Sequence, residues 1–238
     1  MNINGLNSPA KRKKIFHNLQ ILNADIIAVQ EMHINGKQKY LLHDRKLGNA
    51  FMSLDKQKKR GVVLYIKDWI SAKEIFKDKD GRILMVEIEL ENKKILLIRN
   101  VFSEWSTRTL LSKNVQYNNI KEIHYEEICI LGDFNANIDK TMDYKAENKK
   151  IIRRKVLPKI FHDLAKEAKI YDAWREHHPS KKRFTSYSNR HQSWSRLDMV
   201  WMPKKLISEI TEIEIEPSFW ADHSYIKFSW KDQSKTPR

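Results

Sequence analysis

The chain has 238 residues and a formal net charge of +15, from 45 Lys and Arg against 30 Asp and Glu. Its residues are 41% hydrophobic and 10% aromatic, which excludes a disordered basic tail because this composition supplies a core. One cysteine, Cys129, excludes a disulfide framework and a cysteine zinc site, and the longest apolar runs exclude a membrane span or secretory signal. We expect one folded domain with a polyanionic partner, nucleic acid above all.

The first predicted elements are a helix and a buried strand. Ser8-Pro9 is a helix start signal, and apolar residues recur at helical spacing among basic ones, which predicts an amphipathic helix over 8–23. An apolar, β-branched run over 24–30 is typical of a buried strand. Glu31 and His33 therefore stand at the end of a strand.

The middle of the chain predicts a β meander and then a helix and a strand. Five strands are predicted, with Asp80-Gly81 as a hairpin turn, at 50–54, 61–66, 71–76, 83–90 and 94–102. A polar helical pattern covers 110–123. The next strand, over 128–131, runs into Gly132-Asp133-Phe134-Asn135, so a second group of polar residues stands at a strand end.

The last third predicts a helix over 151–168, despite Pro158. Four further strands are predicted near 183–188, 196–202, 210–216 and 224–230. There is no repeat, linker or composition break, so we predict one α/β domain over 1–230, with two packed sheets flanked by helices. The tail over 231–238 is predicted to be disordered.

Polar residues at predicted strand ends are the candidates for chemistry. They are Asn2, Asn4, Glu31, Asp133, Asn135, Asp198, Asp222 and His223. Functional groups of α/β sheets gather beyond the carboxyl ends of strands, so we expect these residues to converge in one pocket. Their types favour hydrolysis of a phosphate ester.

Each residue type has a role in that chemistry. A magnesium ion needs one or two carboxylates and keeps its other positions for water and phosphate, which suits Glu31. Asp133 can orient or deprotonate the attacking water. His223 can donate to the developing negative charge while Asp198 fixes its tautomer, and Asn135 can hydrogen-bond the same charge.

Taken one at a time, these residues also have structural interpretations. Gly-Asp-Phe-Asn after a strand is a common turn composition, and a lone glutamate is usually a surface residue. Asp222-His223 could be a bend that leads into the last strand. The basic runs at 11–14 and 56–60 are solvated faces or phosphate contacts, and the tryptophans are packing residues or, less often, base-stacking ones.

The motifs in their order along the chain resemble the exonuclease-endonuclease-phosphatase superfamily. They resemble most the apurinic-type endonuclease domain of non-LTR retrotransposon (long interspersed element) polyproteins. A similar segment of those domains also matches 172–175, 178–179 and 184–185. The five motifs that carry the resemblance are Asn2-Ile3-Asn4-Gly5-Leu6-Asn7, Gln30-Glu31-Met32-His33, Gly132-Asp133-Phe134-Asn135, Ser195-Arg196-Leu197-Asp198 and Ala221-Asp222-His223-Ser224.

The resemblance implies a fold, an activity and partners. The fold is a four-layered α/β sandwich of two mixed sheets flanked by helices. The activity is nicking of one strand of duplex DNA with a single Mg²⁺, or Mn²⁺ in its place, leaving a 3′ hydroxyl that primes reverse transcription. We expect a monomeric domain of the nucleus or cytoplasm, with no membrane partner and without the reverse transcriptase to which family members are fused.

The resemblance also implies roles for individual residues. Glu31 matches the metal carboxylate, with Asn2 beside it, and Asp222 matches an acidic residue near the metal. The catalytic matches are Asp133 with Asn135, for water activation and the transition state, and the dyad of Asp198 and His223. Phe102, Thr185 and Ser195 match positions near bound DNA. Asn4 replaces the aspartate of repair-type relatives, so repair of abasic sites is not expected.

The chain departs from this family pattern at three places. One is Trp105-Ser106, which lacks the asparagine that the family has nearby. Phe102 stands where the family has a tyrosine whose hydroxyl contacts the scissile phosphate. The apolar strand that precedes the Asn-x-Asn-Gly motif in the family is expected to be absent here. Two alternatives therefore stay open beside an active endonuclease: a remnant that binds DNA without cleaving it, and a phosphatase of the same superfamily. Charge alone would also fit a basic binding protein.

Overall fold

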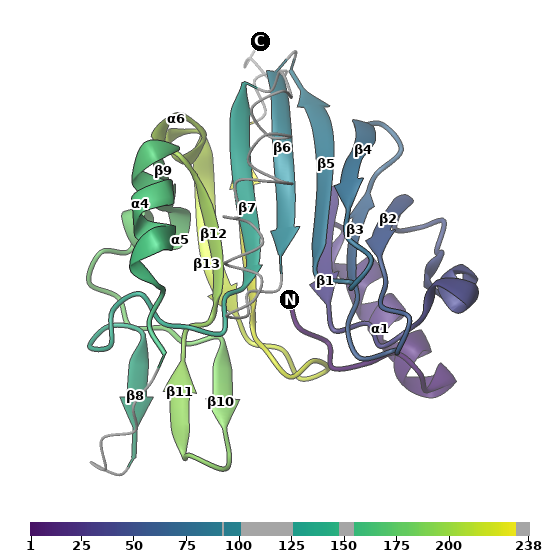
Figure 1. Ribbon diagram of the computed structural model, residues 1–238, viewed down its shortest axis with the longest axis horizontal. Coiled ribbons are helices and arrows are strands. Elements are labelled where there is room, and N and C mark those ends of the chain that lie inside the picture. The colour runs from purple at the N-terminus through teal and green to yellow at the C-terminus, as the bar shows by residue number, and fades with distance from the viewer. Residues whose placement is uncertain (92, 101–125, 148–154, 232–238) are drawn as a thin grey trace.

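The computed structural model describes residues 1–91, 93–100, 126–147 and 155–231 (Figure 1). Several expectations lie outside these residues: the helix over 110–123, Phe102, the start of the helix over 151–168, and the tail over 232–238. Nineteen elements are defined within the described ranges, and they are arranged in layers.

The largest sheet within the described ranges is mixed and has six strands (Figure 1). Adjacent strands are antiparallel except β6 and β7, which run parallel. The ends of β6 and β7 therefore reach the same edge of the sheet. In spatial order the strands are β4 (Ser71–Lys77), β5 (Ile83–Leu90), β6 (Lys93–Asn100), β7 (Glu127–Asp133), β12 (Asp198–Pro203) and β9 (Ile170–Asp172).

Two smaller sheets form a second β layer. β1 (Ile26–Gln30), β3 (Val62–Ile66) and β2 (Asn49–Ser53) make one antiparallel sheet, and β13 (Ile210–Glu216) pairs with β14 (Tyr225–Trp230) in the other. The first residues of the chain lie parallel to the end of β1, because the Gln30 N–H donates to the Met1 carbonyl and the Ile3 N–H to the Gln30 carbonyl. Whether a further strand belongs beside β1 stays a prediction.

A third small sheet extends below the layers. It contains three strands of three residues each, β10 (Ser186–Ser188), β11 (Ser193–Ser195) and β8 (Tyr144–Ala146), and projects beyond the lower edge of the large sheet in Figure 1. The remaining short elements are η1 (Gly36–Leu42), α5 (Ala173–His177) and α6 (Lys204–Ser208).

Two longer helices cover the outer faces. α1 (Pro9–Leu22) begins after the Ser8 side chain, which accepts from the Lys11 N–H, and ends at Asn23 in the left-handed conformation. α4 (Lys159–Glu167) begins after Pro158. The prediction of a helix running through Pro158 was wrong at this point, because Lys155 and Leu157 are non-helical and proline is tolerated at a helix start but not in its interior.

Three clusters of buried apolar residues separate four layers. The middle cluster joins the two β layers and includes Leu64, Val86 and Ile213. A second cluster packs the other face of the six-stranded sheet against Phe161 of α4, and a third packs β1 and β3 against Leu19 of α1. The predicted four-layered α/β sandwich is confirmed.

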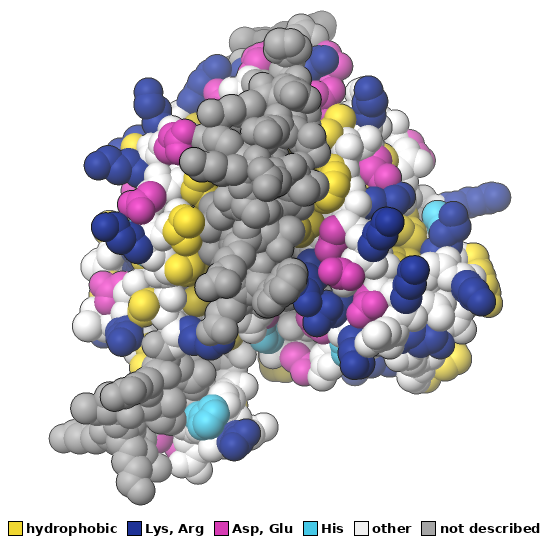
Figure 2. All heavy atoms as spheres, in the orientation of Figure 1, with side chains coloured by type: hydrophobic (Ala, Val, Ile, Leu, Met, Phe, Trp, Pro, Cys, Tyr) yellow, Lys and Arg dark blue, Asp and Glu magenta, His cyan; other side chains and the backbone are white. Residues whose placement is uncertain are grey.

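Basic side chains on the surface and one buried thiol are two further features of the structure. Lys and Arg side chains are spread over the face in Figure 2, with Asp and Glu among them. Cys129 lies in the middle cluster and is 1% exposed. Within the described ranges, the helices are too short or too polar to cross a membrane.

Candidate active site

The predicted site residues gather at the lower edge of the sandwich in Figure 1, where the N-terminus also lies. Asp133 ends β7 and Asp198 begins β12, and the two are partners in the antiparallel register. His223 precedes β14 and bridges to Ser186. The structure brings Asp133, Asp198 and His223 together at this edge, but Asp198 begins its strand and His223 precedes one, whereas both were expected at strand ends. Because β12 runs antiparallel to β7, the start of β12 lies at the edge where β7 ends.

A histidine and two buried carboxylates form the centre of the site. Nδ1 of His223 lies 2.7 Å from Oδ2 of Asp198 and 3.9 Å from Oδ2 of Asp133. Asp133 and Asp198 are 2% and 4% exposed, so both carboxylates depend on His223 and on nearby donors for compensation. Because Asp198 occupies Nδ1, Nε2 is the ring nitrogen that can donate to a substrate.

These three groups have shifted pKa values. Burial alone would lower the pKa of His223, but Asp198 and then Asp133 raise it to about 9. Burial works against the charged form of Asp198 too, but the imidazolium outweighs it and lowers the pKa of this carboxyl. Burial raises the pKa of Asp133, and the Asp198 charge raises it further. The site therefore holds a charged donor beside a carboxylate that is more basic than usual.

A buried pair, Gln30 and Arg99, lies beside Asp133 and is hydrogen-bonded to its backbone. Oε1 of Gln30 accepts from Nη2 of Arg99 at 2.5 Å and from the Asp133 N–H at 3.2 Å. Burial lowers the pKa of Arg99 to about 10, while Asp198, Asp133 and Glu31 oppose this shift. Sequence reasoning missed Arg99 as a site residue, although an arginine inside the apolar run of β6 was a usable signal.

The residues predicted for the metal form a second group. Oε2 of Glu31 lies 2.9 Å from Nε2 of His33. Oδ1 of Asn2 accepts from the Asn4 N–H at 3.1 Å, and Nδ2 of Asn4 donates to Oδ2 of Asp222 at 2.7 Å. Asn2 also bridges to Gln30, so this group is continuous with the histidine and its carboxylates.

Four residues of the site have left-handed backbone conformations. They are Asn4, Glu31, His33 and Asn135, with φ of 45°, 58°, 55° and 48°. Asparagine and histidine adopt this region more readily than most residues, whereas Glu31 has no such preference. Strained backbone of this kind clusters at functional sites, where the surrounding structure holds it in place.

The donor set fits a sparse magnesium site. Glu31 and Asp222 supply carboxylate oxygens, the ligand type that magnesium prefers, and the exposed position of Asp222 leaves room for water and phosphate. Among the described residues, no cluster of three or more His, Cys, Asp or Glu side chains could enclose a metal.

The residues predicted to contact DNA are buried where the structure describes them. Thr185 is 1% exposed, and its hydroxyl accepts from the Leu197 and Asp198 N–H groups at 2.9 and 3.1 Å. Ser195 is 3% exposed and its carbonyl accepts from the Thr185 N–H. Thr185 thus fixes the backbone that carries Asp198, and DNA contact by these residues stays a prediction. The Asn135 side chain is exposed at the same edge, and its N–H donates to Oδ1 of Asp133.

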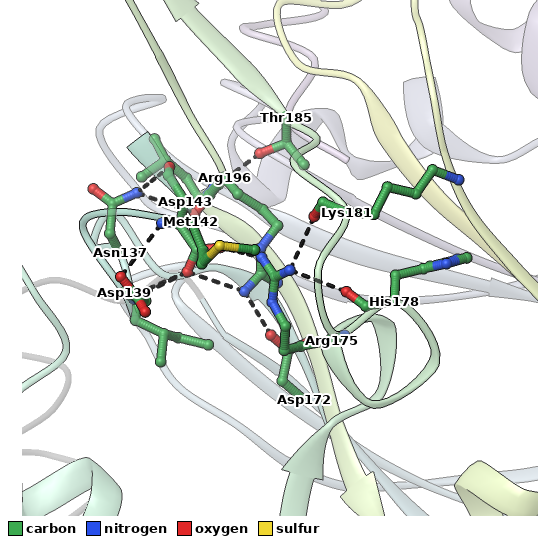
Figure 3. A network of polar contacts seen from close by, with 12 residues as sticks. Asn137, Asp139, Met142, Asp143, Asp172, Arg175, His178, Lys181, Thr185 and Arg196 are labelled. Atoms are coloured by element: carbon green, nitrogen blue, oxygen red, sulfur yellow. Dashed lines mark hydrogen bonds and ion pairs between the residues drawn. The ribbon is translucent and has the colours of Figure 1, made fainter. Parts of the chain in front are cut away.

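An ion cluster fastens the small sheet to this edge (Figure 3). Oδ1 of Asp143 accepts from Nε of Arg196 and Nη2 of Arg175, both at 2.8 Å. Nη2 of Arg196 also lies 2.6 Å from Oδ2 of Asp172. Arg196 stands two residues before Asp198, and both its charge and that of Asp143 are buried. Sequence reasoning quoted Arg196 within a motif but missed its partner.

Comparison with known proteins agrees with this architecture. A model of the Endonuclease/Exonuclease/phosphatase family matches residues 1–219. The fold is similar to an AP endonuclease from Leishmania major, with a TM-score of 0.76, 16% identity and coverage of 97% of this chain and 86% of that one.

Two further solved structures have the same fold. The APE2 catalytic domain of Xenopus laevis has a TM-score of 0.72 and 19% identity, over 98% of this chain and 92% of that one. A 3'-5' exonuclease from Neisseria meningitidis has a TM-score of 0.70 and 16% identity, over 96% and 97% of the two chains. At these identities the likeness concerns the fold.

Proposed function

The chain belongs to the Endonuclease/Exonuclease/phosphatase family, and we propose that it is a magnesium-dependent endonuclease that nicks one strand of duplex DNA. The observation that carries this proposal is the buried His223–Asp198 pair beside the Asp133 carboxylate. A net charge of +15 suits a long polyanion better than a compact phosphorylated substrate, and this favours DNA over the phosphatase alternative.

The catalytic roles follow from the protonation states of these groups. Asp133, whose pKa is raised, accepts a proton from the attacking water. As the water oxygen bonds to phosphorus, the bond from phosphorus to the 3′ oxygen breaks, and that oxygen takes a proton from solvent to become the 3′ hydroxyl. His223, charged at neutral pH, donates from Nε2 to the non-bridging oxygen on which negative charge develops. Asp198 holds the ring in that tautomer, and the exposed amide of Asn135 hydrogen-bonds the same phosphate.

Glu31 and Asp222, with Asn2 beside them, would hold the metal ion. A bound magnesium ion supplies a positive charge that offsets negative charge on the reacting phosphate. Asn4 positions Asp222 through its amide donor, and His33 contacts the Glu31 carboxylate. Thr185, Ser195 and Phe102 are the three residues assigned to DNA contact.

The finer assignment is to the retrotransposon type of this family. It rests on the motif Ser195-Arg196-Leu197-Asp198, on Asn4 in place of an aspartate, and on the segment around Asp172 and Thr185. In that setting the nick supplies a 3′ hydroxyl for reverse transcription at the target site.

A plasmid nicking assay tests the proposal. Wild-type protein is expected to convert supercoiled plasmid to open circles with Mg²⁺ and not with EDTA. Glu31→Gln is expected to lower the rate at least about a hundredfold, because metal catalysis is worth several kcal/mol and each 1.4 kcal/mol is tenfold. DNA affinity should change little, since the Lys and Arg surface is untouched.

The control replaces a glutamate that is exposed on β13, Glu212→Gln, and should nick at the wild-type rate. Wild-type protein that binds plasmid but never nicks it would identify a DNA-binding remnant instead. Release of phosphate from small phosphate esters without plasmid nicking would identify a phosphatase.

A further inference from the structure

A groove beside the candidate active site shares Asp222 with it, but its other lining residues have no role in the reaction described above. It has a volume of about 450 Å³ and lies between the start of α1 and the segment that joins β13 to β14. Lys11 and Lys14 line one side, and Phe219, Trp220 and Asp222 line the other. In Figure 1 this joining segment runs along the lower edge, beneath the first residues of the chain.

Phe219 is the unusual residue of this groove. Its side chain is 93% exposed, whereas the next residue, Trp220, is half-buried against the α1 side of the core. The turn that presents Phe219 is ordered, because Oγ of Ser218 accepts from the Trp220 and Ala221 N–H groups. An exposed phenyl ring on an ordered turn is available to stack on a partner.

Two lysines and one aspartate are the charged residues that line the groove, so its net charge is positive and suits a phosphate backbone. The first turn of α1 has no acidic residue, and Lys14 is exposed at the rim. Nζ of Lys11 donates to the Asn4 carbonyl at 2.7 Å, which places this ammonium next to the metal group. Asp222 is shared between the groove and that group through its bond to Asn4. The groove and the metal group therefore adjoin one another.

We propose that this groove binds an unpaired nucleotide of the substrate, with its base stacked on Phe219 and its phosphates beside Lys11 and Lys14. Duplex DNA hides its base faces inside the stack, and an exposed aromatic ring can reach them only at an end, a gap or an unpaired segment. The proposal rests on the proposed function and narrows its substrate to DNA in which a duplex meets an unpaired segment beside the cleaved bond.

The test uses two hairpin DNAs that differ only in an unpaired overhang of several nucleotides carrying 2-aminopurine. Binding is measured in EDTA, so that no cleavage occurs. The hairpin with the overhang is expected to bind the protein more tightly than the blunt hairpin does. The fluorescence of its 2-aminopurine should be quenched on binding. Phe219→Ala should weaken overhang binding about five- to a hundredfold, the range for loss of one stacked base, and leave blunt binding within about twofold.

Two variants complete the design. Phe219→Trp should restore both affinity and quenching, because tryptophan also stacks. Trp69→Ala is the matched control. Trp69 is 71% exposed, and Nζ of Lys67 lies 5.7 Å from its ring. Trp69 follows the last residue of β3, whereas Gly61, which bonds to Met32 of the site segment, precedes the first. This control should bind both DNAs like the wild type.

The results separate this inference from the proposed function. If plasmid is nicked but Phe219→Ala binds the overhang normally, the inference is wrong and the endonuclease assignment stands. If neither DNA binds and no nicking occurs, the function itself fails. Self-association in sedimentation that depends on Phe219, without any change in fluorescence, would overturn the inference in favour of a second copy of the chain.

Discussion

His223 determines how the site should respond to pH. Its pKa is raised from 6.5 to about 9 by Asp198 and Asp133, against the effect of burial. The ring is therefore charged at neutral pH, and its stabilising contribution is fully present below about pH 6.5 and lost as the pH rises through about 9. The same titration removes the proton that His223 would donate to the substrate.

Removing the Asp198 charge should shift this titration. In Asp198→Asn the largest favourable partner of the imidazolium is lost, so the pKa of His223 should fall well below about 9. Nitrogen-15 NMR of the histidine ring measures this pKa directly. The alkaline limit of nicking should move to lower pH together with it, and an unchanged pKa would contradict the assigned pair.

The residues of the candidate site were predictable where they belong to the sequence motifs. Asp133, Asp198 and His223 were predicted and lie within 4 Å of one another along two contacts. Gln30 and Arg99 were not assigned roles, because a buried amide that joins an arginine to a backbone N–H depends on the pairing of β1, β6 and β7 in space. No spacing along the chain encodes such a contact.

Elements differ in how well the sequence predicts them. β5 and β13 have the predicted bounds, since seven or eight residues show a clear apolar pattern. β8, β9 and β11 were not predicted, because three residues define no period. Asp143 directly precedes β8 and Arg196 directly follows β11, so the ion pair between them joins two short strands that are far apart in the sequence (Figure 3).

Loss of Asp143 should therefore destabilise the protein strongly. Arg196 is fully buried, and Asp143→Ala removes two hydrogen bonds that Arg196 donates. The same change removes the carboxylate with which Arg175 forms an ion pair. Breaking a buried ion pair costs about 3 to 5 kcal/mol of unfolding free energy. Urea unfolding monitored by circular dichroism measures it.

An exposed aspartate on α4 provides the comparison for this variant. Asp163→Ala should change the unfolding free energy by less than about 0.5 kcal/mol. Equal stabilities for the two variants would mean that the ion cluster does not fasten the small sheet.

At the scale of the whole molecule, charge should dominate DNA binding. The chain carries a net charge of +15, and Lys and Arg side chains are spread over the face shown in Figure 2. Contacts of this kind are made mainly with phosphates, and neutralising six to ten of them lowers affinity about 10³- to 10⁵-fold between 50 and 200 mM salt.

The measurement is affinity against salt concentration for two unrelated duplex sequences. Both should give the same steep slope, because phosphate contacts carry no sequence information. A flat slope would remove nucleic acid as the partner.

The reactivity of the Cys129 thiol can report on unfolding of the central sheet. This thiol lies on β7 between β6 and β12, and burial raises its pKa to about 12, so a thiol-specific reagent cannot reach or attack it in the folded chain. Labelling should proceed only through molecules whose central sheet has come apart. A DNA ligand that binds the folded state should slow labelling by the factor 1 + [L]/Kd. One sulfur atom can thus quantify substrate affinity in EDTA, without cleavage and without an attached dye.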